Sequence, residues 1–366
     1  MQQHDNRTYS DNSTIRSRKK TMTSVYDPWL MRILRLGVWV LKFNAALVGV
    51  IGVLLYWFQS KMIYPSSMPQ GSREKVPRPS DFDMKDWQEI ELTAPDQVIT
   101  KAFVILAKPT PDKTNLLGTA LEQWRARRPT LLMLHANAGN VGHRLPIAKI
   151  IVERFSCNVV AISYRGYGHS SGSPSEKGIL LDSQTALDYI QSHPILQSSP
   201  LFLYGQSLGG AVAIGLASDQ VNQGKITGVI LENTFANLRK LIPVVMPLIG
   251  PLAFLCHQTW YSDRRMQQIS AGMDAPAFLF LSGTKDDLIP TTHFRILYDL
   301  CPSQRKCWKA FKDGTHSYMT RVSRKITSLL WEAGSKKCIP VSNMLELESA
   351  SGGGGAESVE MIDPIL

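Results

Sequence analysis

Short apolar runs alternate with longer, partly polar stretches over most of this chain, from residue 86 to residue 334. A short apolar run bounded by turn residues predicts a buried strand, and the stretches between such runs predict helices. The expected strands span 87–93, 101–108, 129–135, 157–163, 228–232, 276–281 and 306–312, with one more that begins at Leu201 and a last helix over 319–331. Strands that alternate with helices form a mostly parallel sheet covered on both faces. The pattern therefore predicts a single α/β domain over 86–334.

The alternation breaks between residues 237 and 274. Within this segment, residues 241–255 are apolar but contain three prolines and a glycine. Proline interrupts a helix, and the run is too broken to cross a membrane. We therefore expect a lid of short helices over 237–274, inserted between two strands of the domain.

One helix start is marked by Ser173-Pro-Ser-Glu176. Serine is a favoured N-cap, proline suits the first helical position, and a glutamate three residues after the cap completes a capping box. We therefore expect Ser173 to cap a helix that begins at Pro174.

Residues 36–58 form a long apolar stretch, interrupted by Lys42 and Asn44. About 20 apolar residues span a bilayer, and Tyr56 and Trp57 lie where an interfacial aromatic belt would be. A cleaved signal peptide is the alternative, but no small-residue cleavage site follows the stretch. The sequence therefore predicts one transmembrane anchor over 36–58.

The segments that flank the anchor and the domain are polar or rich in turn residues. Residues 1–28 predict a disordered basic tail, and residues 335–366, rich in Gly, Ser and acidic residues, predict a flexible tail. Residues 64–85 contain four prolines and few large apolar residues. We expect this segment to be a tether between the anchor and the domain.

The net charge is +10, and the calculated isoelectric point is about 9.3. No basic stripe is interleaved with aromatic residues, so we expect a membrane surface rather than nucleic acid as the partner. Basic residues precede the anchor, which by the positive-inside rule places the N-terminus in the cytoplasm and the domain on the other side. Without a sorting signal, the endoplasmic reticulum is the membrane we expect.

The five cysteines have no metal-site spacing, and an odd number argues against a complete disulfide framework. Cys301 and Cys307 are close enough in sequence to pair in an oxidising compartment; free thiols are the alternative that we favour. We expect no metal site.

The stretch from Leu201 to Leu216 carries the strongest chemical signal. An apolar strand turns through Gly205-Gln-Ser-Leu-Gly-Gly210 into a helix of small and apolar residues. This G-x-S-x-G turn holds its serine in a strained position above the sheet, and a Cβ at either flanking glycine would crowd the turn. The stretch could also be a glycine-rich turn with an incidental serine. We interpret Ser207 as a nucleophile, which needs a base and an acid to activate it.

Both partners are found where parallel sheets place their sites, at the carboxyl ends of strands. Asp286 follows the strand 276–281, and His316 follows the last strand. We expect His316 to accept the proton of Ser207 and Asp286 to orient the imidazole, with Asp287 as the adjacent alternative. Singly, a turn-capping aspartate and a surface histidine would be ordinary.

A tetrahedral intermediate needs two N–H donors. We expect one from the backbone of Leu208, directly after the nucleophile. The other should come from the turn after the strand 129–135, where we choose Asn137, with Ala138 as the alternative. We expect His135, at the end of that strand, to fix the turn structurally.

These motifs together resemble the α/β-hydrolase superfamily, and more narrowly its membrane-anchored bud-emergence-protein (Bem) type. The resemblance rests on the anchor, on the turn over 205–210 that carries Ser207 (the elbow) and on the Asp286 and His316 loops. It also rests on the motifs HANAGN over 135–140, YRGYG over 164–168 and ENTF over 232–235. It implies an α/β-hydrolase fold and a serine hydrolase without cofactors. Family members carry glycine where this chain has Ala136, which raises the question of whether the oxyanion turn keeps its geometry.

These features predict a membrane-anchored serine hydrolase that cleaves an ester or thioester through an acyl-enzyme on Ser207. The lid and the anchor favour a lipid or an acylated substrate. The alternative is a membrane scaffold that keeps the fold and acts by binding. A scaffold has no need of Ser207, Asp286 and His316 together, so the sequence favours the enzyme.

Overall fold

The computed structural model describes residues 28–272 and 275–316. The chain divides into two compact units, residues 1–53 and 54–366. Helix α1 (Pro28–Ile63) contributes to both. Among the described residues it is the one helix long and apolar enough to cross a membrane, with a mean hydropathy of 2.1 over an 18-residue window within residues 29–63. The helix extends beyond the predicted 36–58 at both ends. The expected last helix at 319–331 and both predicted tails lie wholly or almost wholly outside the described residues.

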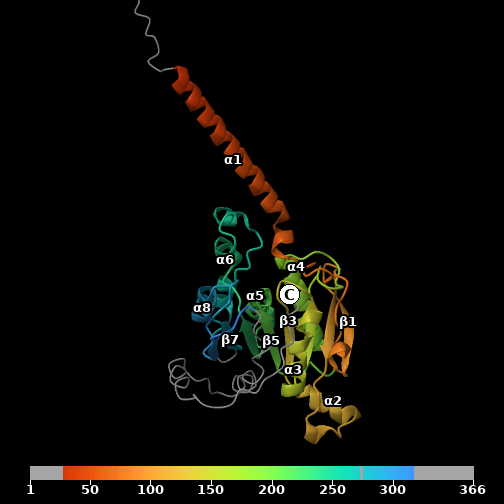
Figure 1. Ribbon diagram of the computed structural model, residues 1–366. Coiled ribbons are helices and arrows are strands. Elements are labelled where there is room, and N and C mark those ends of the chain that lie inside the picture. Colours follow the sequence, from red (N-terminus) through yellow and green to blue (C-terminus); the bar gives the residue numbers. More distant parts are fainter. Residues whose placement is uncertain (1–27, 273–274, 317–366) are drawn as a thin grey trace, which may run out of the picture. The chain divides into compact units, whose positions relative to one another are not determined.

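The second unit has the α/β-hydrolase fold (Figure 1), as predicted. Its eight strands form one sheet in the order β1-β2-β4-β3-β5-β6-β7-β8, in which β2 pairs antiparallel with β1 and β4 and all other neighbours are parallel. The strands are β1 (Trp87–Thr93), β2 (Ile99–Ile105), β3 (Thr130–Leu134), β4 (Asn158–Ser163), β5 (Leu201–Gln206), β6 (Gly228–Glu232), β7 (Ala277–Gly283) and β8 (Lys306–Phe311).

Helices lie on both faces of the sheet. Successive residues of a strand point to opposite faces, and every residue of β3 to β7 is buried, so both faces are covered. Leu132 and Leu203 pack with α4 and α5 in one apolar cluster, whereas Leu131 and Phe202 pack with α3 in another. The first cluster also contains Met266 of α7 and Phe294 and Leu297 of α8. The α-helices of this unit are α2 (Gly118–Ala126), α3 (Leu145–Phe155), α4 (Glu176–Ser192), α5 (Leu208–Ser218), α6 (Leu238–Val245), α7 (Ser262–Gln268) and α8 (Thr291–Leu300), and the short 3-10 helices are η1 (Pro79–Phe82), η2 (Pro111–Lys113), η3 (Val141–Arg144), η4 (Gln220–Asn222) and η5 (Gly250–Leu255).

The insertion between β6 and β7 contains α6, η5 and α7, in the segment where we expect a lid. Its base is fixed by Trp260, whose side chain is fully buried. The backbone N–H of Trp260 donates to Glu176 Oε2 at 2.8 Å, and Arg265 donates to Glu176 Oε1 at 2.9 Å. One glutamate at the start of α4 therefore holds both the segment before α7 and α7 itself.

This use of Glu176 explains why the predicted capping box is wrong. Helix α4 begins at Glu176, two residues later than expected, and its N-cap is Ser175, whose hydroxyl accepts from Gly178 N at 3.1 Å. The Glu176 carboxylate is engaged by the insertion and does not turn back to a cap. The local pattern was genuine, but a tertiary contact takes the carboxylate.

Residues 64–85, which we expected to form a tether, make several contacts with the domain. The Tyr64 hydroxyl donates to Gln258 Oε1 at 3.0 Å and accepts from Trp260 Nε1 at 2.8 Å, and its side chain is 3% exposed. Further along, Asn140 Nδ2 donates to the carbonyls of Ser72 and Lys75, both at 2.9 Å. The segment that follows α1 is thus tied to the hydrolase fold at successive points.

Candidate active site

Ser207 lies between β5 and α5 with φ 53° and ψ −116°, a conformation that L-residues rarely adopt. Three bonds hold it there. Its N–H donates to the carbonyl of Glu232 at 2.9 Å, and its own carbonyl accepts from Thr234 Oγ1 at 2.6 Å and from Gly210 N at 3.0 Å. Strained backbone persists where its surroundings over-determine it, and such positions concentrate at active sites.

The glycines of the elbow are required by close approach of neighbouring backbone. A Cβ on Gly205 would lie 2.2 Å from the carbonyl oxygen of Gly209, and one on Gly209 would lie 2.0 Å from that of Leu134. The crowding predicted at both positions is confirmed. Because β3 and β5 are neighbours, the contact at Gly209 also brings the start of α5 against the end of β3.

Asp286 and His316 are brought together by the loops after β7 and β8. The Asp286 Oδ2 lies 2.9 Å from His316 Nδ1, and its Oδ1 accepts from the N–H groups of Leu288 at 2.9 Å and Ile289 at 2.8 Å. The Asp286 side chain is 2% exposed, and that of His316 is 18% exposed. Asp287, the alternative acid, is exposed. Asp286 is thus the carboxylate that can orient this imidazole.

Two amide side chains tie the His316 loop to the elbow. The carbonyl of His316 accepts from Gln206 Nε2 and from Asn233 Nδ2, both at 3.2 Å. Asn233 also accepts from Gly283 N at 2.8 Å, so it links the ends of β6 and β7 to this loop. Within the described residues the Ser207 hydroxyl makes no hydrogen bond to His316; the link runs through Gln206, the residue before the serine. Catalytic hydrogen bonds are often long before substrate binds.

Asn233 belongs to the ENTF motif, but no role was predicted for it from the sequence, although its position at a strand end could have indicated one. It follows a buried strand directly and has φ 43°. Asparagine is among the few residues that tolerate this region, and its side chain can bond to backbone nearby. An asparagine at a strand end beside the nucleophile strand is therefore a candidate for joining loops.

The two expected oxyanion donors lie on adjacent elements. Leu208 is the first residue of α5, so its N–H is one of the four at the helix start without an intrahelical acceptor. The Asn137 side chain is engaged elsewhere: its Nδ2 donates to the carbonyl of Ile63, and its Oδ1 accepts from the Tyr167 hydroxyl at 2.7 Å. Only the backbone N–H of Asn137 is left to face a substrate. Ala138, the alternative, is exposed.

Ala136 does not disturb this turn. The described non-glycine residues with positive φ do not include it, so the Cβ of Ala136 meets no backbone restriction. The alanine side chain is 6% exposed, and its carbonyl accepts from His135 Nδ1 at 2.7 Å. The turn therefore does not need the glycine that family members carry at this position, and alanine fits its backbone.

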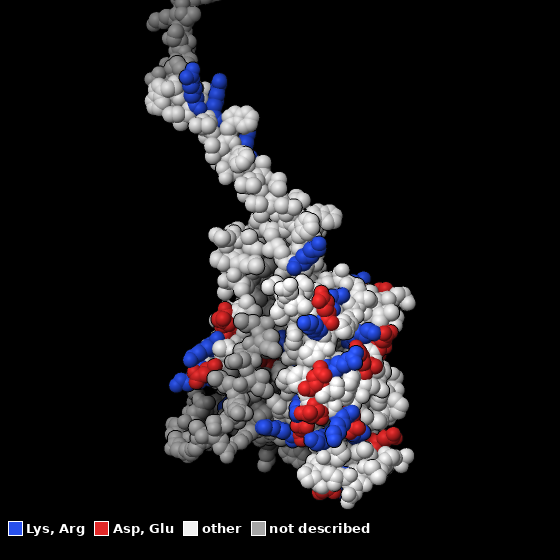
Figure 2. All heavy atoms as spheres, turned by 45° about the vertical axis from the view of Figure 1, so that its right-hand side comes forward, with Lys and Arg blue, Asp and Glu red and all other residues white. Residues whose placement is uncertain are grey.

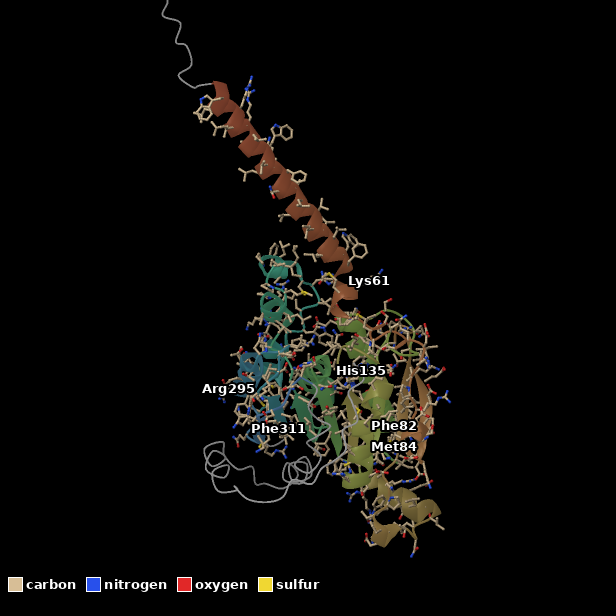
Figure 3. The ribbon with its side chains drawn as sticks, viewed as in Figure 1. Lys61, Phe82, Met84, His135, Arg295 and Phe311 are labelled. Atoms are coloured by element: carbon tan, nitrogen blue, oxygen red, sulfur yellow. The ribbon has the colours of Figure 1, made fainter. Side chains whose placement is uncertain are left out.

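His135 lies where β3 ends, inside the domain (Figure 3), and is 1% exposed. Burial lowers its pKa to about 3, so the ring is neutral. With the proton on Nδ1 for the Ala136 carbonyl, Nε2 can accept from Tyr164 N at 3.4 Å, and the ring packs 4.1 Å from that of Tyr164. A neutral ring with both nitrogens occupied is suited to holding a turn rather than to moving protons.

A buried carboxyl group beneath the elbow was also missed from the sequence. Glu232, at the end of β6, is 2% exposed; it accepts from the Tyr204 hydroxyl at 2.6 Å and from Gln206 Nε2 at 3.1 Å. Burial raises its pKa to about 7, although Arg144 and His316 lie near enough to oppose the shift. Through Gln206 the carboxyl group is joined to the His316 carbonyl.

No cluster of three His, Cys, Asp or Glu side chains able to hold a metal occurs in residues 28–272 and 275–316. Four cysteines lie in these residues, Cys157, Cys256, Cys301 and Cys307; all are buried, and no disulfide joins any two of them. The possible pairing of Cys301 with Cys307 is therefore not formed.

Comparison with known proteins identifies relatives over most of the chain. Residues 125–274 match a family model described as serine aminopeptidase, S33. Protein bem46 of Schizosaccharomyces pombe is 43% identical over 264 residues, which are 72% of this chain and 81% of that protein. The uncharacterized membrane protein YNL320W of Saccharomyces cerevisiae is 37% identical over 74% of this chain and 87% of its own. The α/β-hydrolase domain-containing protein WAV2 of Arabidopsis thaliana is 33% identical over 69% and 78%.

Solved structures show the same fold at low identity. An α/β hydrolase from Vibrio vulnificus matches with a TM-score of 0.59 and 16% identity, covering 75% of this chain and 92% of that chain. An esterase from Pyrococcus furiosus matches with a TM-score of 0.53 and 17% identity, covering 70% and 92%.

Proposed function

We propose that this chain, which belongs to the Bem46 family of α/β hydrolases, is a membrane-anchored serine hydrolase that cleaves an ester or thioester. Ser207 would attack the acyl carbonyl while His316 Nε2 takes the hydroxyl proton, and Asp286 would hold the Nδ1–H tautomer and stabilise the imidazolium. The N–H groups of Leu208 and Asn137 would bind the oxyanion, each typically contributing about 3–4 kcal/mol. His316 would then protonate the leaving alcohol or thiol, and water activated by His316 would release the acid.

The observation that carries this proposal is the hydrogen bond between Asp286 and His316 on a loop tied to the elbow. Asp286 has one carboxylate oxygen fixed by two backbone N–H groups and the other facing the imidazole. The His316 loop is bonded to Gln206, the residue before the strained Ser207, and a protein that acts only by binding has no need of this arrangement. The arrangement supports nucleophilic catalysis over a scaffold that acts only by binding.

A lipid or acylated substrate is supported by the apolar helix and by the apolar insertion that follows β6. YNL320W, a relative, is named as a membrane protein, which agrees with membrane association of this chain. We place the N-terminus in the cytoplasm and the protein in the endoplasmic reticulum or another endomembrane, on the charge distribution around α1 and the lack of a sorting signal.

The first experiment is labelling of the detergent-solubilised full chain by a fluorophosphonate, with the wild type beside Ser207→Ala. We expect labelling of the wild type and none of the variant. A folded wild type that takes no label would refute the hydrolase proposal and favour the scaffold. Active enzyme would then be compared on acyl esters, acyl thioesters and aminoacyl amides. Equal rates on short soluble and long-chain esters would count against a lipid substrate.

A further inference from the structure

We infer that the tip of the insertion is a second membrane contact, buried in the interfacial region of the bilayer that α1 enters. The tip comprises the chain from Pro243 to Leu248 together with Phe254. Every residue from Pro243 to Leu248 is exposed, and none is charged. Leu248 is 96% exposed and Phe254 is 65% exposed. Isolated exposed apolar residues are ordinary, but a contiguous group marks an interaction surface.

The tip is held beside the part of α1 that belongs to the same unit. Gln59 Oε1 accepts from His257 N at 2.8 Å, and Gln59 Nε2 donates to the carbonyl of Leu255 at 3.3 Å. The rings of Tyr56 and His257 lie 5.1 Å apart with their planes at 67°. The chain just after the tip is therefore bonded to the last turns of the apolar helix.

Those turns of α1 carry exposed apolar side chains of their own. Trp57 is 76% exposed, and Leu54, Tyr56 and Phe58 are each about half exposed. They lie inside the stretch that is apolar enough to cross a membrane. The contacts of Gln59 and Tyr56 with residues 255–257 thus hold two apolar groups in one unit, and lipid is the occupant that suits both.

The charges around the tip fit the same occupant. No Asp or Glu occurs between residues 233 and 262. Lys240 of α6 pairs with Asp263 at 2.8 Å, whereas Arg239, also in α6, and Lys61, near the end of α1, form no ion pair among the residues that the structure describes. Figure 2 shows mostly uncharged spheres at the upper end of the domain, with most acidic and basic groups lower on it. Figure 3 labels Lys61 at the upper end of the domain. Apolar residues in the acyl boundary with cations at headgroup level are the composition of interfacial membrane elements.

The test is a depth measurement on the full chain in phosphatidylcholine vesicles. Cys338 is replaced by serine, and a single cysteine is placed at Leu248 or, as a matched control, at Leu117. Leu117 is also an exposed leucine, 78% exposed, and precedes α2 at the end of the domain away from α6 (Figure 1). The native thiols Cys157, Cys256, Cys301 and Cys307 are buried, which disfavours their labelling; burial also raises the pKa of Cys157 to about 12, that of Cys301 to about 11 and that of Cys256 above its usual value. Each single cysteine then receives an NBD fluorophore.

We expect nitroxide on the upper acyl chain to lower the Leu248→Cys signal about two-fold or more, because interfacial elements lie about 5–10 Å below the headgroup boundary. Aqueous iodide should quench only the Leu117→Cys probe. Two results would overturn the inference. Iodide quenching of both probes would mean that the tip lies in water, and protection from both quenchers would mean that protein, either a second copy or another segment of this chain, covers it. The measurement needs no catalysis, so it stands apart from the proposed activity.

Discussion

Replacing Asp286 by asparagine tests the candidate site through the tautomer of His316. In the wild type, Oδ1 accepts two backbone N–H bonds and Oδ2 faces His316 Nδ1. An asparagine must keep its carbonyl oxygen toward the two N–H donors, which turns its NH2 group toward the imidazole. His316 then accepts at Nδ1 and carries its proton on Nε2. In that state it cannot take the proton of Ser207.

The size of the effect follows from the two arrangements open to the amide. Turning it the other way leaves two backbone donors without acceptors, at about 1–3 kcal/mol each. The asparagine therefore stays in the inactive arrangement. A wrong tautomer in a serine-histidine-aspartate site lowers kcat by about 10⁴, which is about 5.5 kcal/mol in the barrier. We expect Asp286→Asn to lose between about 10³ and 10⁴ in activity.

The assay is the second-order rate of fluorophosphonate labelling, together with kcat/KM on an activated ester and a melting curve to establish folding. Asp287→Asn is the matched control, because Asp287 is adjacent and exposed, and it should change the rates less than about two-fold. If folded Asp286→Asn retained activity within about ten-fold of the wild type, the role assigned to Asp286 would be wrong. An equal loss in Asp287→Asn would refute the assignment in the same way.

Three further changes test the structure around the site. Asp182 is fully buried and bonded to Arg165, so Asp182→Ala should cost about 3–5 kcal/mol in urea unfolding, while Asp96→Ala, which removes the exposed carboxylate on the same Arg165, should cost less. The raised pKa of Glu232 means that stability falls as pH rises from 4.5 to about 7, by about 3 kcal/mol, so Glu232→Gln should flatten the dependence of Tm on pH between 4.5 and 7. Gly209→Ala should abolish fluorophosphonate labelling or prevent folding, because the new Cβ would lie 2.0 Å from a carbonyl oxygen at the end of β3; normal labelling of this variant would contradict the geometry of the elbow.

The elbow could be predicted because its requirements are local. Gly205, Ser207 and Gly209 lie within five residues, and the strand before and the helix after them are continuous in sequence. Asp286 and His316 could be proposed because strand ends in a parallel sheet converge at one edge. The alternating apolar runs predicted the sheet because buried parallel strands are apolar on both faces.

What the sequence could not supply depends on contacts between distant segments. Glu176 was expected to complete a local cap, but it binds the insertion more than 80 residues away. Glu232 and Asn233 form hydrogen bonds between strand ends, and the order of those strands in the sheet cannot be predicted from local sequence. The chain after α1 has the composition of a linker. The burial of Tyr64 could not be predicted from it, because that burial depends on Trp260, 196 residues away in the sequence.

The contacts of Tyr64, Ser72 and Lys75 also bear on whether a protease could separate the domain from α1. Release by a protease requires an exposed, extended stalk between anchor and ectodomain, because nicking occurs where backbone is neither buried nor hydrogen-bonded. Here Tyr64 is 3% exposed, and the carbonyls of Ser72 and Lys75 are both hydrogen-bonded to Asn140. A proteolytic cut in this segment would break contacts that belong to the fold of the domain. Proteolysis of this segment is therefore a poor route for separating an intact domain from α1.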